Sequence, residues 1–170
     1  MAWAALAGYC GYASEPYYYD YGTSTVYEGD NVYVNGDTTA TPAVYASQAT
    51  AIADAGPQAS PPKDDESLTL GVFGMVQGDE TTANQVVQLK VNKQGLISGE
   101  YYNATTDTTE KISGSVDKKS QRAAWTVGDR KNVVYEAGIA NLTKPETTML
   151  IHYGTDKTQQ WTLVRIENPQ

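Results

Sequence analysis

Apolar and polar positions alternate with a period of two from residue 67 onward, which is the pattern of strands with one buried face. Val87, Leu89 and Val91, for example, share one face of a predicted strand. Short turns rich in Gly, Asp and Asn separate successive runs, so neighbouring strands are expected to pair antiparallel. The pattern predicts strands over residues 68–77, 85–92, 96–103, 109–116, 122–127, 132–138, 147–153 and 159–166.

Eight short strands in a row predict an antiparallel up-and-down meander. Closing such a meander removes both edge strands, and eight strands make the smallest common barrel. We therefore predict a mainly β fold, an eight-stranded antiparallel up-and-down β-barrel over residues 67–170, with a β-sandwich as the alternative. The last strand, 159–166, is apolar on both faces, so a helix or an interface is expected to cover it.

Residues 23–56 predict a β-hairpin followed by one short helix. The pair Gly29-Asp30 lies between two β-rich runs and suits the turn of a hairpin. Thr41 is a natural N-cap, and Pro42 suits the first helical position because its missing N–H is not needed there. Neither element is stable alone, so both should pack on the barrel.

Charge and composition change sharply near residue 62. Residues 1–62 contain six acidic and no basic residues, whereas the rest of the chain holds 14 acidic and 12 basic ones, which together give the net charge of −8. We predict a Tyr- and Gly-rich disordered arm over 1–22 and a Pro-rich linker over 57–66, ahead of the barrel domain. The first ten residues lack the positive segment of an intact signal peptide.

Several classes of function are disfavoured by composition. A net charge of −8 argues against nucleic-acid binding, and no apolar stretch reaches the roughly 18–20 residues of a membrane span. One Cys and one His make neither an internal disulfide nor an ordinary zinc site, and no phosphate-binding loop is present, so no cofactor or metal is expected.

Catalytic constellations are also scarce. His152 is expected at the surface or rim, and the strand carboxylates Glu100, Glu136 and Glu167 are expected to be solvated. A carboxylate-dependent hydrolase would need two of these carboxylates within roughly 5–10 Å of each other. We therefore predict no catalytic residues, with such a hydrolase as a remaining alternative.

Aromatic residues on the strands are the better lead to a binding site. Large amphipathic side chains are spread over five predicted strands, and inside a barrel they would either fill the core or line a cup for a small ligand. Asn103 shares a face with Tyr101 and joins them as a candidate. The aromatic candidates are Tyr101, Trp125, Tyr135, Tyr153 and Trp161.

Two sets of segments resemble known proteins. The first set resembles exported planctomycete proteins of the mu-protocadherin-like cell-surface family, whose activity is unknown. This resemblance implies an extracytoplasmic location, at the cell surface or secreted. It is carried by residues 71–77 (GVFGMVQ), 91–101 (VNKQGLISGEY), 112–118 (ISGSVDK), 121–129 (QRAAWTVGD), 136–143 (EAGIANLT) and 161–165 (WTLVR), and by the hairpin region.

The second resemblance is to the avidin and streptavidin barrel. Residues 95–101 (GLISGEY), 124–127 (AWTV) and 161–164 (WTLV) are similar to its strands in order and spacing. The resemblance implies that Tyr101 and Trp161 face a ligand and that Glu167 approaches the last carboxylate of that family. The family has an asparagine where this chain has Met75, so the resemblance implies the barrel rather than biotin binding.

The sequence as a whole predicts a non-enzymatic extracytoplasmic or cell-surface module for structure or binding. The alternatives are an avidin-like small-molecule binder with a cup at one barrel end, and a carboxylate-dependent hydrolase. A small molecule or an envelope protein is the expected partner, and a homo-oligomer is a further possibility. The predicted ligand-binding residues are Tyr101, Asn103, Trp125, Tyr135, Trp161 and Glu167.

Overall fold

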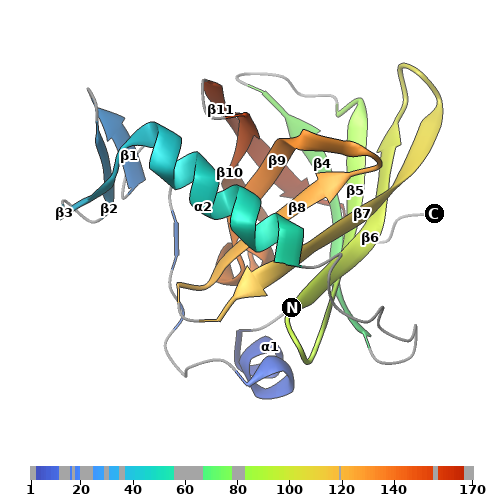
Figure 1. Ribbon diagram of the computed structural model, residues 1–170. Coiled ribbons are helices and arrows are strands. Elements are labelled where there is room, and N and C mark those ends of the chain that lie inside the picture. Colours follow the sequence, from blue (N-terminus) through green and yellow to red (C-terminus); the bar gives the residue numbers. More distant parts are fainter. Residues whose placement is uncertain are drawn as a thin grey trace.

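The main body of the protein is a closed barrel of eight antiparallel strands (Figure 1). The computed structural model describes residues 3–11, 16, 18–19, 25–28, 31–34, 37–55, 67–77, 83–118, 120–154 and 157–166. Each barrel strand pairs with the next along the chain, and the last pairs back with the first, which confirms the predicted up-and-down barrel. The strands are β4 (Ser67–Val76), β5 (Gln85–Asn92), β6 (Leu96–Asn103), β7 (Thr108–Asp117), β8 (Arg122–Val127), β9 (Arg130–Gly138), β10 (Glu146–Tyr153) and β11 (Lys157–Arg165).

Alternate side chains of the strands point inward and fill the barrel with apolar volume. At Gly99 the φ angle is +146°, and a Cβ atom there would lie only 1.8 Å from the Gln88 carbonyl oxygen, so only glycine allows this close approach of β5 and β6. The buried interior includes Phe73, Met75, Val87, Leu89, Val91, Ile97, Ile112, Val116, Val127, Ala137, Met149, Ile151 and Leu163.

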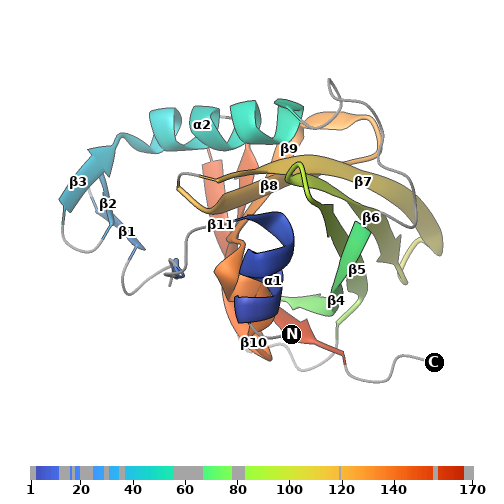
Figure 2. The same cartoon turned by 90° about the horizontal axis from the view of Figure 1, so that it is seen from below.

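A short helix, α1 (Trp3–Cys10), lies at one end of the barrel (Figure 2). Leu6, Ala7 and Cys10 belong to the same buried cluster as the barrel interior, and the Cys10 thiol lies 3.7 Å from the Asn92 carbonyl oxygen. The sequence pattern predicts one helix in the chain and none here, so the structure corrects it. Residues around α1 are apolar on every side, and the helix is stabilised by tertiary burial rather than by an amphipathic period.

Further along the N-terminal part, Tyr19 is fastened to the barrel by its backbone and its hydroxyl. Its N–H donates to Asn141 Oδ1 and its carbonyl accepts from Asn141 Nδ2, both at 2.8 Å. Its hydroxyl donates to the Ser120 carbonyl oxygen at 2.7 Å. Asn141 lies on a short 3-10 helix (Ala140–Thr143) after β9 and is buried. This part of the chain therefore contacts the folded domain at defined points.

The predicted hairpin is present as part of a small antiparallel sheet. β1 (Thr25–Glu28), β2 (Asn31–Val34) and β3 (Asp37–Ala40) pair in that order, so the sheet has one strand more than predicted. The predicted helix follows as α2 (Pro42–Ala55), and the Thr41 hydroxyl accepts from the Val44 N–H at 3.2 Å. The Gly29-Asp30 turn and the linker over 57–66 lie outside the described residues.

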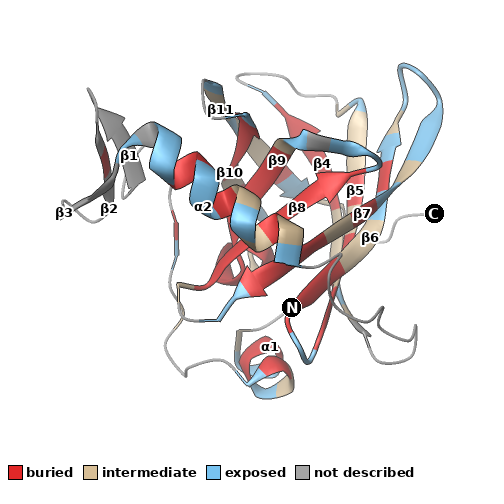
Figure 3. Ribbon diagram, viewed as in Figure 1, coloured by how far each residue is buried: buried red, intermediate tan, exposed pale blue. Residues whose placement is uncertain are grey.

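Helix α2 packs on the outer face of β7, β8 and β9 (Figure 1). Its buried residues face the barrel and its exposed ones face away (Figure 3), and Ala49 and Ala53 pack on Ala124 and Val134. Helix α2 therefore does not cover β11, and the other expected cover of this strand, an interface, stays a prediction. Val164, on the outer face of β11, is 37% exposed.

Candidate functional site

Most of the predicted aromatic residues gather in the half of the barrel away from α1. Helix α1 touches Asn92 at one end of β5, whereas the Tyr101 hydroxyl reaches Gln85 at the other end. The ring centroids of Tyr101 and Tyr135 are 6.4 Å apart, and those of Trp125 and Tyr135 are 6.3 Å apart with an interplanar angle of 7°. We call this group the aromatic end: Tyr101, Trp125, Tyr135, Tyr153 and Trp161.

Glutamine side chains accept hydrogen bonds from three of the aromatic side chains in this group. The Tyr101 hydroxyl donates to Gln85 Oε1 at 2.6 Å. The Tyr153 hydroxyl and the Trp161 indole Nε1 both donate to Gln159 Oε1 at 3.2 Å. Each of these rings is therefore oriented by a side-chain amide as well as by packing.

Two polar groups deeper in the barrel have a different environment. The Trp125 side chain is fully buried, and its indole Nε1 has no hydrogen-bond acceptor among the residues that the structure describes. Burial raises the pKa of Tyr135 to about 12, with a further contribution from Tyr101, so its hydroxyl stays protonated at neutral pH. A buried N–H without an acceptor is unfavourable, and a ligand or water that accepts from it would be stabilised.

Charged side chains lie at the rim of the same end. Arg130 Nη2 is 2.5 Å from Glu110 Oε2, and both side chains are exposed. The Arg130 guanidinium lies 5.7 Å from the Tyr101 ring centroid, and Lys157 Nζ lies 5.6 Å from that of Tyr153. The rim therefore sets cations against aromatic faces.

The structure brings together five of the six residues predicted to bind a ligand. Tyr101, Trp125 and Tyr135 belong to the buried cluster, and Trp161 packs against it half-buried. The Asn103 side chain forms a hydrogen bond with Tyr101, and its Oδ1 also accepts from the Thr105 backbone N–H at 2.9 Å in the turn after β6. Glu167 lies outside the described residues.

A second group of polar residues lies on the opposite, outer face of the same strands, under α2. Arg122 on β8 donates to both Glu136 oxygens, from Nε at 2.6 Å and from Nη2 at 3.0 Å. His152 Nε2 lies 2.7 Å from Glu136 Oε1, and its Nδ1 lies 2.8 Å from the Thr158 hydroxyl. We call Arg122, Glu136 and His152 the buried ionic cluster, since each is at most 5% exposed.

The buried ionic cluster also forms hydrogen bonds with helix α2. Arg122 Nη2 donates to the Tyr45 carbonyl oxygen at 3.0 Å, and Nη1 donates to Gln48 Oε1 at 2.7 Å. The guanidinium carbon lies 3.7 Å from the Tyr45 ring centroid. Because these contacts join α2 to three barrel strands, the cluster fixes the position of the helix on the barrel.

Electrostatics keep Glu136 ionised. Burial alone would raise its pKa, but the hydrogen bond from His152 and the charge and hydrogen bonds of Arg122 outweigh burial and lower the pKa below its ordinary value. An ionised carboxylate only accepts, so the hydrogen in the contact with His152 is assigned to Nε2. The other ring nitrogen, Nδ1, makes the contact with the Thr158 hydroxyl.

These positions correct two expectations. Glu136 is buried rather than solvated, and His152 is buried rather than at the rim. Both occupy outward positions that would face water on a bare barrel, and α2 with its neighbours covers them. The opposite charges of Arg122 and Glu136 at outward positions of adjacent predicted strands were the signal available in the sequence.

The contacts of the buried ionic cluster limit the catalytic chemistry that it could perform. Thr158, His152 and Glu136 follow the hydroxyl–imidazole–carboxylate order of a hydrolase relay, but Arg122 binds the same carboxylate. Glu100 lies on β6 and Glu136 on β9, with β7 and β8 between them in the barrel, so the two carboxylates are not cross-strand neighbours.

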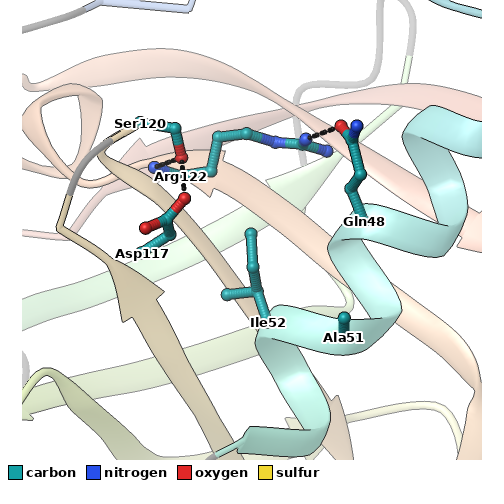
Figure 4. A pocket seen from close by; sticks show the side chains of 6 residues that line it. All are labelled: Gln48, Ala51, Ile52, Asp117, Ser120 and Arg122. Atoms are coloured by element: carbon teal, nitrogen blue, oxygen red, sulfur yellow. Dashed lines mark hydrogen bonds between the residues drawn. The ribbon is translucent and has the colours of Figure 1, made fainter.

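A pocket of about 420 Å³ lies beside the buried ionic cluster, between α2 and the turn that joins β7 to β8 (Figure 4). Within the described part of the chain, no three His, Cys, Asp or Glu side chains form a group suited to a metal ion. None of the described helices is long and apolar enough to cross a membrane. No protein-family model, curated protein or solved structure matches the chain.

Proposed function

We propose that this protein is a non-enzymatic binding module that works outside the cytoplasm and takes a small, flat ligand at the aromatic end. The observation that carries the proposal is the fully buried Trp125 indole, whose N–H has no acceptor among the described residues, stacked on Tyr135 within the same group of rings. Ligand sites at the ends of barrels combine apolar walls with a few such polar atoms.

The chemistry of the group favours an uncharged molecule with a hydrogen-bond acceptor. Trp125 Nε1 and the protonated Tyr135 hydroxyl are donors, while Tyr101 and Trp161 add flat faces. The Arg130–Glu110 pair is itself neutral, and Lys157 is a further cation at the rim, beside the Tyr153 ring. The resemblance to avidin supports a binding role for this end, although Met75 makes biotin a poor candidate.

The non-enzymatic part of the proposal is supported by the carboxylates. Glu100 and Glu136 lie on strands that do not pair with each other, and the Glu136 carboxylate is bound by Arg122 and His152. The extracytoplasmic location is supported by the resemblance to exported cell-surface proteins. It is tested by adding protease to intact source cells, where a cytoplasmic chain would be protected from cleavage.

Ligand binding is tested by saturation-transfer NMR and tryptophan fluorescence with benzamide, indole, adenine and biotin. At least one of the first three compounds should bind saturably, and Trp161→Ala should weaken that binding about tenfold. Val164→Ala, on the outer face of the same strand, is the matched control and should leave binding unchanged. The proposal fails if none of the compounds binds, or if Trp161→Ala has no effect.

A further inference from the structure

Two glutamines contact the rings of the aromatic end, one on each side of β4 in the barrel. Gln159 on β11 lies opposite Ile151 on β10, and Gln85 on β5 shares a strand face with Val87. Ile151 and Val87 belong to the buried interior, so both glutamines occupy inner positions of the barrel. Each glutamine is half-buried.

The carbonyl oxygen of Gln159 is fully used by two aromatic donors. An indole N–H can only donate, so the contact with Trp161 fixes which end of the amide is the oxygen. The Tyr153 hydroxyl donates to the same oxygen, and together the two bonds occupy both of its lone pairs. The Gln159 NH2 group makes no hydrogen bond with the residues that the structure describes, so it is left to donate.

Gln85 repeats this arrangement with Tyr101. Asn103 forms a side-chain hydrogen bond with Tyr101, and its Oδ1 already accepts from the Thr105 N–H, so its NH2 group is the part that donates to the Tyr101 hydroxyl. The hydroxyl in turn donates to Gln85 Oε1 at 2.6 Å. The Gln85 NH2 group has no acceptor within the described part of the chain and is a second donor without a partner.

Two more donors lie deeper in the barrel. The buried Trp125 Nε1 has no acceptor among the described residues. The Tyr135 hydroxyl likewise makes no hydrogen bond with any described residue, and because burial raises its pKa to about 12 it keeps its proton at neutral pH. The aromatic end thus carries four donors that a ligand can use.

The acceptors of the same region are already occupied. The amide oxygens of Gln85, Gln159 and Asn103 accept from the protein itself, and the Glu110 carboxylate at the rim is bound by Arg130. A donor group of a ligand would therefore meet another donor. Such a contact leaves both groups without a partner and weakens binding.

On the basis of the proposed binding role of the aromatic end, we infer that its ligand is a flat, uncharged ring with two carbonyl oxygens and no donor of its own, as in an N-substituted cyclic imide. One carbonyl oxygen accepts from the deep donors, Trp125 and Tyr135. The other accepts from the glutamine NH2 groups, and the ring lies between the aromatic side chains. The inference rests on the proposed function and adds the class of ligand to it.

The test uses three flat, uncharged bicyclic molecules that differ in their hydrogen-bonding groups. N-methylphthalimide has two carbonyl acceptors, 1-indanone has one, and indole has a donor and no carbonyl. Binding at neutral pH is measured by saturation-transfer NMR and by titration calorimetry. N-methylphthalimide should bind about tenfold more tightly than 1-indanone, and 1-indanone more tightly than indole. Indole is the least polar of the three, so burial of apolar area alone would favour the reverse order.

The outcomes separate this inference from the proposed function. Indole binding as tightly as N-methylphthalimide would overturn the inference and leave a binding site for flat molecules in place. Absence of N-methylphthalimide binding while benzamide or indole binds would have the same meaning. Failure of every flat compound to bind would refute both.

Substitution of the glutamines locates the contact. Gln159→Glu keeps an oxygen that accepts from Tyr153 and Trp161 but removes the NH2 donor. It should weaken N-methylphthalimide binding about tenfold and leave indole binding nearly unchanged. Gln85→Glu should act in the same way. Gln160→Glu makes the same chemical change at the next, exposed position of β11 and is the matched control, with no expected effect.

Two results with these variants would overturn the inference. The first is unchanged binding of N-methylphthalimide in both Gln159→Glu and Gln85→Glu, since the amide donors would then not contact the ligand. The second is an equal loss of indole and N-methylphthalimide binding, since the added charge, rather than the lost donor, would then be the cause.

Discussion

Strands β8, β9 and β10 bury both of their faces, and they do so by different chemistry. On the inner face, Trp125 and Tyr135 stack within an apolar core. On the outer face of the same strands, Arg122, three residues before Trp125, and Glu136, next to Tyr135, form an ion pair beneath α2. The two faces share the same strands and are both nearly completely buried. The inner face is buried by apolar contacts, whereas the outer face is buried around an ion pair.

This difference determines how substitutions on each face affect the stability of the protein. An apolar face is stabilised by area removed from water and by close packing, so its loss scales with the volume removed. A buried ionic face gains little net stability from its charges, yet removing one partner leaves another charge buried without compensation. The inner face should therefore respond to size, and the outer face to charge balance.

The largest expected effect is on the inner face. Trp125→Ala should lower the free energy of unfolding by about 3–5 kcal/mol, because a fully buried indole is replaced by a cavity. Chemical denaturation measures the change. Trp125→Phe, which keeps most of the volume and removes the unpaired N–H, should cost clearly less, and equal losses for the two variants would contradict a packing role.

Next in size is a change on the outer face. Arg122→Met should cost about 3 kcal/mol, because Glu136 then stays buried with its main partner gone. The triple change Arg122→Met, Glu136→Leu, His152→Leu should recover most of that loss, since no charge remains to be compensated. If the triple variant is less stable than Arg122→Met, the cluster contributes net stability and the comparison between the faces fails.

The sequence predicts the elements whose positions depend on local alternation, but not those whose positions depend on tertiary contacts. The barrel strands follow from the alternation itself, as with Val87 and Leu89, because a period of two marks one buried face. Alternation cannot tell that the second face of β8 and β9 is also buried. That information lies in α2, which is distant in sequence and is placed by tertiary contacts with Ala124, Val134 and Arg122.

Of the two candidate sites, the sequence could predict one and not the other. The aromatic end was predictable because large inward residues on successive strands must meet inside a closed barrel. The pocket beside α2 was not, because it needs Gln48 and Asp117 to come together across the docked helix. Helix α1 was not predicted for a related reason. Its apolar residues show no helical period, and they are buried only by packing against the end of the barrel.

Helix α1 extends the inner core, and a smaller change there tests this role. Leu6→Ala should lower the free energy of unfolding by about 2–3 kcal/mol, because Leu6 is fully buried in the core cluster. The sequence alone predicts a disordered arm over residues 1–22, where a substitution should leave the stability unchanged, so the two expectations differ. Thermal unfolding of Leu6→Ala decides between them, with Ala5→Gly, at an exposed position of the same helix, as the control for helix propensity.

Acidification should affect the outer face alone. The pKa of Glu136 is lower in the folded state than its ordinary value of 4.5, so its contribution to stability is present above that value and is lost as the pH falls through the folded pKa. Melting temperatures measured from pH 7 downward should therefore fall below about pH 4.5 more steeply for the wild type than for Glu136→Gln. Parallel curves for the two proteins would mean that Glu136 does not stay ionised in the folded state.

The smallest effect is expected for an ion pair that lies on neither buried face. Arg130 and Glu110 form a 2.5 Å contact at the rim, with side chains that are 49% and 36% exposed. Water screens such a pair, and exposed pairs contribute about 0.2–1 kcal/mol at most. Glu110→Gln should therefore shift the unfolding midpoint slightly, and 0.5 M NaCl should remove the difference from the wild type. The contrast with Arg122→Met, at a similar contact distance, isolates burial as the cause. A loss at Glu110→Gln as large as that at Arg122→Met would mean that distance, rather than the exclusion of water, decides how much a charge pair matters in this protein.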